Sequence, residues 1–298
     1  MEKPPAHLAE NSQVTELETH LMGIVSKLRL LLIGDFHGRV PDMLRGKLSS
    51  YGIDACLCVG DLCEADEMRQ IFYMHLPELR RGTSPADIFR LIPAETHRSA
   101  MDSMQVVLDF LAQLQVPVFL VPGNVDYLAE TVKLLTCAVD KLVLEERISA
   151  TENLSLLEKE AIDFGGYQIL GYGGLRMRAV EAQSQMEELC RRELEQLSLK
   201  VVNWRRAIFL AHWPPYGTLD QIQDPDSPLH GEHWGTEFFL RFIEWRQPLV
   251  FACGHIHEQQ GKANIGQTLV SNPGYAREGQ AAILTLVAGK IGDLDFIR

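Results

Sequence analysis

Aspartate, asparagine and histidine side chains recur beside glycines in this chain, most of them directly after apolar runs. In chain order the pieces are Gly34-Asp35-Phe36-His37, Gly60-Asp61, Gly123-Asn124-Val125-Asp126, a lone His212 and Gly254-His255-Ile256-His257. Carboxylate and amide oxygens gathered with imidazole nitrogens form the mixed ligand set that divalent metal ions bind. A pair of such ions generates hydroxide at neutral pH and neutralises a phosphate group. The pieces therefore indicate the chemistry of a metal-dependent phosphoester hydrolase.

The spacing of the pieces suggests how they would share two ions. Asp35 and His37 are two residues apart, so one oxygen and one nitrogen can reach the same ion. Asp61 can donate one oxygen to each of two ions, which would hold them roughly 3.5–4 Å apart. Asn124 would add a neutral oxygen and so limit the negative charge. The expected metal ligands are Asp35, His37, Asp61, Asn124, His212, His255 and His257.

Apolar runs precede the first three pieces and predict the elements that position them. Residues 28–33, 55–59 and 117–121 are almost continuously apolar, as strands buried on both faces are. Helices are expected over 41–51 and, from apolar residues three and four apart, over 99–115. Strands that alternate with helices favour an α/β fold with a largely parallel sheet and its chemistry at the carboxyl edge.

The remaining chain predicts an insertion, a hairpin and further strands. Three prolines divide residues 64–98, which we expect to be an insertion of short helices near the site. Gly165-Gly166 predicts a hairpin of 161–164 with 167–172. We expect an N-terminal extension over 1–27 and one domain over 28–298. Its other elements would be helices over 176–200 and 236–245, and strands over 207–210, 249–253, 268–271, 281–287 and 291–297.

Composition excludes some classes of protein. Of 298 residues, 46% are hydrophobic and 23% charged, as in soluble globular proteins. The formal net charge of −12 argues against stable binding to duplex nucleic acid, which needs Lys and Arg to neutralise phosphates. No membrane segment or signal peptide is evident. Cysteines inside apolar runs (Cys56, Cys58 and Cys253) suggest reduced thiols, so we expect a cytoplasmic enzyme of unspecified oligomeric state.

The order of the pieces resembles the pattern of the calcineurin-like metallophosphoesterase superfamily: D-x-H, G-D, G-N-[HCx]-[DE], a lone His, then G-H-x-H. The similarity covers about residues 28–298. It implies a four-layer αββα sandwich with two central mixed sheets and two divalent transition-metal ions (Mn²⁺, Fe, Zn²⁺ or a mixture). By the same resemblance, one ion is bound by Asp35, His37, Asp61 and His257, and the other by Asp61, Asn124, His212 and His255.

Two further motifs are most similar to the small phosphodiesterase branch of that superfamily. They are His212-Trp213-Pro214-Pro215-Tyr216-Gly217 with Asp220, and Gly254-His255-Ile256-His257-Glu258 with Asn272-Pro273-Gly274. The resemblance implies a metal-bridging hydroxide that attacks phosphorus in line, while the ions and His212 hold the non-bridging oxygens. Asp61, Asn124 and His212 are the residues expected to be catalytic.

One position departs from the family pattern. Many members have a histidine directly after the asparagine, and it assists the reaction at the leaving group, but this chain has Val125. Since general acid catalysis is worth roughly 10²–10⁴-fold, poor leaving groups should react slowly. This favours phosphodiesters over phosphomonoesters as substrates. His230, His233 and Tyr127 are alternative proton donors, although surface or structural roles fit them better.

Other residues near the motifs have less specific interpretations. Asp126 is expected to support a ligand rather than bind metal itself. Cys63 should be a buried bystander. Arg176 and Arg178 could hold a phosphate, although exposed charges at a helix start explain them better. The histidines outside the motifs, His7, His20, His75 and His97, are expected at the surface.

Two rival functions use the same residues. A nuclease would share the chemistry, but the acidic balance of the chain counts against a polymer substrate. A non-catalytic scaffold, as found among superfamily relatives, usually has a damaged ligand set, whereas every ligand position is filled here. A phosphodiesterase that acts on a small phosphoester is therefore the preferred interpretation.

Overall fold

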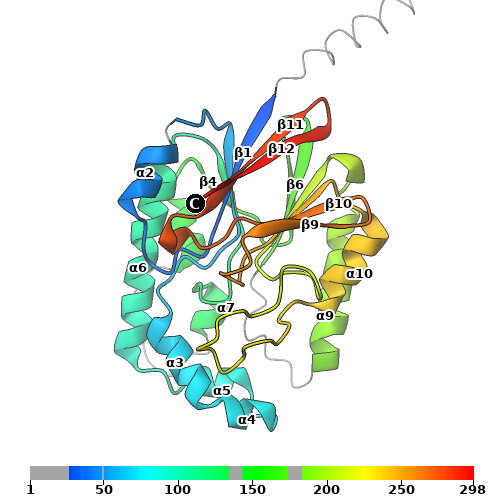
Figure 1. The fold of residues 1–298 in the computed structure, drawn as a ribbon. Coiled ribbons are helices and arrows are strands. Elements are labelled where there is room, and N and C mark those ends of the chain that lie inside the picture. The colour runs from blue at the N-terminus through cyan, green and yellow to red at the C-terminus, as the bar shows by residue number, and fades with distance from the viewer. Residues whose placement is uncertain (1–26, 49, 134–142, 174–182) are drawn as a thin grey trace, which may run out of the picture.

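The computed structural model describes residues 27–48, 50–133, 143–173 and 183–298, and within them two sheets lie face to face between helices (Figure 1). Residues 1–26 of the N-terminal extension, with His7 and His20, fall outside these ranges. So do Arg176, Arg178 and the other first residues of the helix expected over 176–200. Among the described residues, none of the helices is both long and apolar enough to cross a membrane.

The first sheet has six strands in the order β12-β11-β1-β2-β3-β4. From β1 to β4 neighbouring strands are parallel, whereas β11 is antiparallel to both β1 and β12. Its strands are β1 (Leu28–Ile33), β2 (Ala55–Cys58), β3 (Val118–Leu120), β4 (Leu154–Leu156), β11 (Ala281–Val287) and β12 (Lys290–Ile297).

The second sheet also has six strands, in the order β5-β6-β7-β8-β10-β9. The four central strands are parallel, and the edge strands β5 and β9 pair antiparallel with their neighbours. The strands are β5 (Glu160–Phe164), β6 (Tyr167–Tyr172), β7 (Ala207–Ala211), β8 (Val250–Ala252), β9 (Gly261–Ile265) and β10 (Thr268–Asn272).

Helices cover the outer faces of both sheets (Figure 1). Helices α2 (Asp42–Leu48) and α6 (Ala94–Ala112) lie against the first sheet, and α9 (Gln183–Ser198) and α10 (Glu237–Arg246) against the second. The remaining α-helices of the described residues are α3 (Asp66–Met74), α4 (Leu76–Arg80), α5 (Pro85–Phe89), α7 (Ala129–Val132) and α8 (Leu144–Ser149).

Three apolar layers hold this arrangement together. In β1, Leu31 and Ile33 face the helices, while Leu30 and Leu32 face the second sheet. Phe209 of β7 belongs to the third layer, beneath α9 and α10. A strand buried on both faces cannot use a polar residue on either, which explains the uninterrupted apolar runs. The predicted four-layer αββα sandwich with two mixed sheets is confirmed.

Several local predictions need correction. Helix α6 begins at Ala94 rather than near Ser99, because Pro93 stands at its N-cap, where the missing N–H costs nothing. Strands β4 and β9 were not expected from the sequence. His97 was wrongly expected at the surface: it is buried, and its Nδ1 lies 2.6 Å from the Tyr127 hydroxyl.

The described cysteines in the strands fit the expected thiol chemistry. Cys56, Cys58 and Cys253 are fully buried, and no disulfide joins them to another described residue. Burial raises the pKa of all three thiols well above the usual value, because the thiolate would lack hydration. Cys63 is likewise buried in the apolar layer beneath α6.

Candidate metal centre

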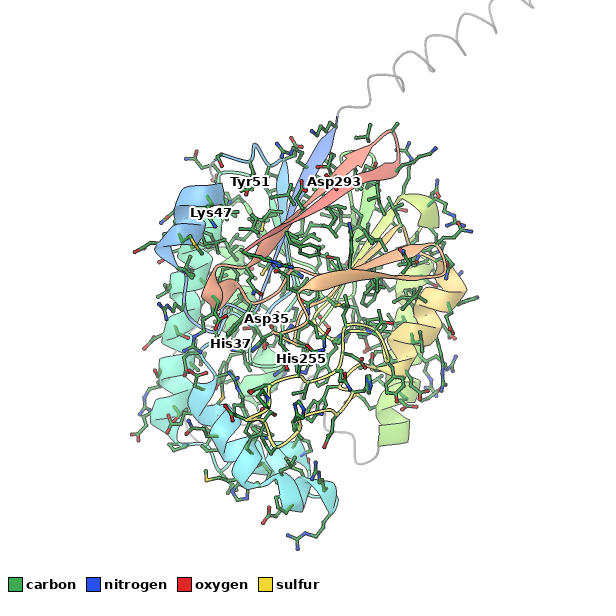
Figure 2. The ribbon with its side chains drawn as sticks, in the orientation of Figure 1. Asp35, His37, Lys47, Tyr51, His255 and Asp293 are labelled. Carbon is green, nitrogen blue, oxygen red and sulfur yellow. The ribbon has the colours of Figure 1, made fainter. Side chains whose placement is uncertain are left out.

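The carboxyl ends of β1 and β2 place two of the expected ligands side by side. Asp35 follows β1, and its backbone N–H donates to Gly60 O over 2.8 Å. The backbone N–H groups of Phe36 and His37 both donate to Asp61 O. These bonds extend the parallel pairing beyond the strands, so the two loops leave the sheet together. Figure 2 shows Asp35, His37 and His255 gathered beneath the sheet edge.

Glycines allow the loops to approach closely. A side-chain carbon on Gly60, whose φ is +94°, would lie 2.4 Å from the backbone nitrogen of Gly123. One on Gly123 would lie 2.0 Å from Asp61 Oδ1. Only glycine fits at both positions, because any side chain would collide with the neighbouring loop. This explains why a glycine precedes the expected metal ligand in each of these loops.

Four of the expected ligands have left-handed backbone conformations. Non-glycine residues adopt positive φ rarely, and such strain costs on the order of 1–3 kcal/mol each. The turns that direct these side chains toward one another require the positive φ angles. The residues and their φ angles are Asp35 (56°), His37 (44°), Asp61 (54°) and His255 (72°).

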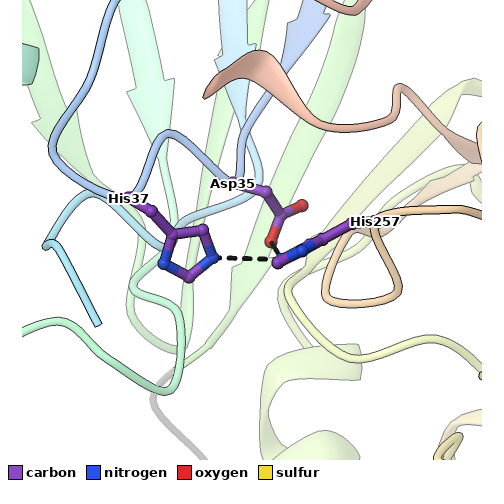
Figure 3. A group of neighbouring side chains, drawn as sticks. All are labelled: Asp35, His37 and His257. Atoms are coloured by element: carbon purple, nitrogen blue, oxygen red, sulfur yellow. Dashed lines mark hydrogen bonds and ion pairs between the residues drawn. The ribbon is translucent and has the colours of Figure 1, made fainter. Parts of the chain in front are cut away.

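The first cluster consists of Asp35, His37 and His257 (Figure 3). The Nε2 atoms of the two histidines lie 3.0 Å apart, and His257 Nε2 lies 3.6 Å from Asp35 Oδ1. Both oxygens of Asp35 also accept the backbone N–H of His255, at 3.2 and 3.1 Å. One oxygen and two ring nitrogens therefore converge within a space that suits a single ion.

The second cluster consists of Asp61, His212 and His255. The Nε2 atom of His212 lies 3.3 Å from Asp61 Oδ2, 3.2 Å from His255 Nδ1 and 2.9 Å from Asn124 Oδ1. The Nδ1–H of His212 donates to Val59 O over 2.8 Å, which turns Nε2 toward the cluster. A backbone acceptor that fixes the orientation of an imidazole is typical of metal-ligating histidines.

Asp61 connects the two clusters. Its Oδ2 lies 3.6 Å from His37 Nε2 of the first cluster and 3.3 Å from His212 Nε2 of the second. Its Oδ1 accepts the backbone N–H of Val125 over 3.0 Å. The structure thus brings all seven expected ligands together around one carboxylate.

The pKa values of the histidines in the two clusters are shifted in different directions. Burial lowers the pKa of His37 to about 4, and burial with the neighbouring His212 lowers that of His255 well below its usual value. For His212, burial opposes the charge, but the Asp61 carboxylate raises the pKa to about 9. Burial would raise the pKa of Asp61, yet His212 holds it below its usual value. Neutral imidazoles and an ionised carboxylate are the forms that bind metal.

This donor set fits divalent transition-metal ions. The Nε2 atoms of His37 and His257 face each other over 3.0 Å, and burial disfavours a proton on His37. In the second cluster His255, whose pKa is also lowered, turns Nδ1 toward His212 Nε2 over 3.2 Å. Such a concentration of buried lone pairs is stabilised when cations lie among them. A mixture of imidazole nitrogens and carboxylate or amide oxygens suits Mn²⁺, Fe or Zn²⁺.

Asp126 supports the centre through the backbone, as expected. Its buried carboxylate accepts N–H groups from Asp61, Leu62, Cys63 and Gly123 at 2.7 to 3.2 Å. These bonds fasten the loop after β2 to the loop after β3. Asp126 therefore sets where Asp61 stands without facing the cluster itself.

We expect Asp126→Asn to weaken metal binding by roughly 10–100-fold, as losing an outer partner of a ligand does. The amide replaces one acceptor oxygen with a donor that faces backbone N–H groups, so the loops separate. Metal titration by calorimetry would measure this change, with exposed Asp295→Asn as the matched control. Equal affinities for the two variants would show that the four bonds do not position Asp61.

The alternative proton donors lie in different environments. Tyr127 is fully buried, and its hydroxyl is bonded to His97 and Met68, so it cannot meet a substrate. The Nδ1 of His230 lies 3.1 Å from Asp224 O at the surface. His233 Nδ1 lies 2.7 Å from Oδ1 of buried Asp220.

Aromatic rings beside the ligands were not predicted from the sequence. Tyr275 stacks on His257 with centroids 4.0 Å apart and planes 6° apart. Trp213 stacks on His255, also at 4.0 Å, with planes 29° apart. The signal was present in the motifs, because Trp213 follows His212 directly and Tyr275 follows Asn272-Pro273-Gly274. The two aromatic rings therefore restrict rotation of the His257 and His255 imidazoles.

Comparisons with known proteins agree with this geometry. The sequence profile of a family described as metallophosphoesterase, calcineurin superfamily, matches residues 22–295. Uncharacterized protein MJ1162 of Methanocaldococcus jannaschii is 30% identical over 172 residues, which are 56% of this chain and 69% of that protein.

Solved structures share the fold. One crystal structure aligns with a TM-score of 0.67 at 21% identity, covering 91% of this chain and 99% of the other. The crystal structure of TT1561 from Thermus thermophilus aligns with a TM-score of 0.52 at 17% identity, covering 92% of this chain and all of that one.

Proposed function

Since the chain belongs to the calcineurin superfamily of metallophosphoesterases, we propose that it is a phosphodiesterase acting on a small soluble substrate. Family membership and the two ligand clusters support a metal-dependent phosphoester hydrolase with a dinuclear centre. The observation that carries this interpretation is the position of Asp61, whose Oδ2 lies within 3.6 Å of a histidine from each cluster.

The residues divide between two proposed ion positions. When bound, the ions would supply hydroxide at neutral pH and offset the charge of the phosphate. Asp61 would be shared between them. The first ion would be held by Asp35, His37, Asp61 and His257, and the second by Asp61, Asn124, His212 and His255.

The chain's own residues determine which esters would react. Val125 is 7% exposed and has no group that could protonate a leaving oxygen. Substrates whose leaving groups are stable without a proton should therefore react best. His212, held by Val59 O, is the residue proposed to steady a non-bridging phosphate oxygen. The preference for a diester over a monoester rests on this missing acid.

A panel of substrates tests the proposal. Chelator-treated protein would be assayed with bis(p-nitrophenyl) phosphate, p-nitrophenyl phosphate and single-stranded DNA, each after addition of Mn²⁺, Zn²⁺ or Fe²⁺. We expect no turnover before metal is added, and faster hydrolysis of the diester than of the monoester or of DNA afterwards. A preference for the monoester would replace the proposal with a phosphatase, and cleavage of DNA above both with a nuclease. Turnover with none of the three substrates would overturn it.

A further inference from the structure

Three aromatic rings meet at the side of the second cluster. The ring centroid of Trp213 lies 4.0 Å from that of His255 and 6.2 Å from that of Trp234. The planes of the two indoles differ by only 15°, and Trp234 lies 6.4 Å from His255 with planes 34° apart. Trp213 is thus stacked on His255, and the nearly parallel indoles of Trp213 and Trp234 place apolar rings beside otherwise polar ligands.

The loop that carries both tryptophans is held in a fixed shape. Buried Asp220 accepts N–H groups from Gly217 at 2.9 Å, Gly235 at 3.1 Å and the His233 ring at 2.7 Å. The Trp234 indole N–H donates to Glu232 over 3.3 Å. The indole orientation is thus set before any ligand arrives, which lowers the entropy that a bound ring would lose.

This loop borders the metal centre on one side. Figure 1 shows it in yellow below the two sheets, between α3–α5 and α10. Arg80 at the end of α4 forms an ion pair with Glu232 over 2.5 Å, so the loop also contacts the short helices of the first half of the chain. Trp234 is only partly buried, and the indole N–H of Trp213 has no hydrogen-bond partner among the described residues.

We propose that Trp213 and Trp234 form an aromatic wall that selects phosphodiesters whose retained ester group, the one that does not leave, carries a flat, unsaturated ring. Trp213 would steady His255 and support Trp234, whose indole would stack on the substrate ring. Stacking on an aromatic side chain is worth roughly tenfold or more in affinity and tolerates many rings, because every ring has a π face. The selection of substrate rests on the proposed function, whereas the binding of a ring does not.

Three diesters with one leaving group test the wall. Methyl, p-nitrophenyl and thymidine 5′-esters of p-nitrophenyl phosphate release the same p-nitrophenolate, so only the retained group changes. We expect Trp234→Ala to lower kcat/KM for at least one ring-bearing ester by about tenfold, and to change that for the methyl ester by less than about twofold. Trp234→Phe should keep most of the preference. The ester whose kcat/KM falls in Trp234→Ala shows which ring stacks on the indole. That ring either adjoins the phosphate, as p-nitrophenyl does, or is separated from it by a sugar, as thymine is.

Matched controls separate stacking from folding. Trp245 on α10 is 58% exposed and lies outside the three-ring group, so Trp245→Ala should leave all three rates unchanged. Equal losses for all three esters would mean that Trp234 acts on the fold or on the shared p-nitrophenyl leaving group, and would overturn the proposal. No loss for any ester would overturn it as well.

A binding measurement covers the case in which no ester is hydrolysed. That result would end the proposed function, but calorimetry of phenylphosphonate and methylphosphonate with the metal-loaded protein would still test the wall. We expect the phenyl compound to bind about tenfold more tightly to the wild-type protein, and the two compounds to bind equally to Trp234→Ala. Equal affinities in the wild-type protein would overturn the aromatic wall for rings that adjoin the phosphorus.

Discussion

Replacing Asp61 with asparagine is expected to reduce hydrolysis of bis(p-nitrophenyl) phosphate by roughly a thousandfold or more, the scale set by losing a charge that stabilises the reacting phosphate. The amide has the same size and can still accept the Val125 N–H, so the loop keeps its shape. It lacks the negative charge that faces histidines of both clusters. Rate measurements with elemental analysis would show that metal and activity are lost together.

The control for this change is Asp163→Asn, which removes an exposed carboxylate from β5. It should retain wild-type rate and metal content. An Asp61→Asn protein that holds two ions and turns over at more than about a tenth of the wild-type rate would remove Asp61 from its proposed role.

Gly123→Ala should have the second-largest effect, although it changes no ligand. The added carbon would lie 2.0 Å from Asp61 Oδ1 and 2.4 Å from the Asp61 backbone nitrogen, and no rotamer relieves the backbone contact. The loop must move, and a shift of about 1 Å at a reacting centre can cost roughly 10²-fold in rate. We expect kcat/KM to fall by about that factor, with a stability loss of about 1–3 kcal/mol from overpacking.

Gly46→Ala is the matched control. Gly46 lies within α2, where an added carbon would have no atom of another described residue within 4 Å, apart from the backbone of its own helix. This variant should melt slightly higher than wild type, since alanine favours a helix over glycine by about 1 kcal/mol, and its rate should not change. If Gly123→Ala behaved like Gly46→Ala in both measurements, the close contact between the two loops would not determine the geometry of the site.

Much of the centre was predictable because its elements have strong local signatures. The apolar run of β1 followed by Gly34 and Asp35 predicts both a strand buried on two faces and a turn at its end. Parallel strands bring their carboxyl ends to one edge, which predicts that the residues after β1, β2 and β3 meet. His212, His255 and His257 follow strands of the second sheet, and the family resemblance was needed to predict that they join the same site.

Other features depend on partners that a local pattern does not contain. Strands β4 and β9 are short edge strands with mixed polar and apolar residues, and their pairing partners determine them. His97 lacks a motif, yet Tyr127, thirty residues away, gives it a buried partner. The contact of Trp234 with His255 arises because a long loop folds back, and no spacing in the sequence encodes that return.

The positive φ angles at Asp35, His37, Asp61 and His255 also bear on how this protein could be engineered. Glycine at any of them would relieve strain that the native side chain imposes. Directed evolution for thermal stability alone would therefore replace these residues and give a protein that is more stable but inactive. Their retention would record selection for reactivity over robustness, and screens for hardier variants should hold these four positions fixed.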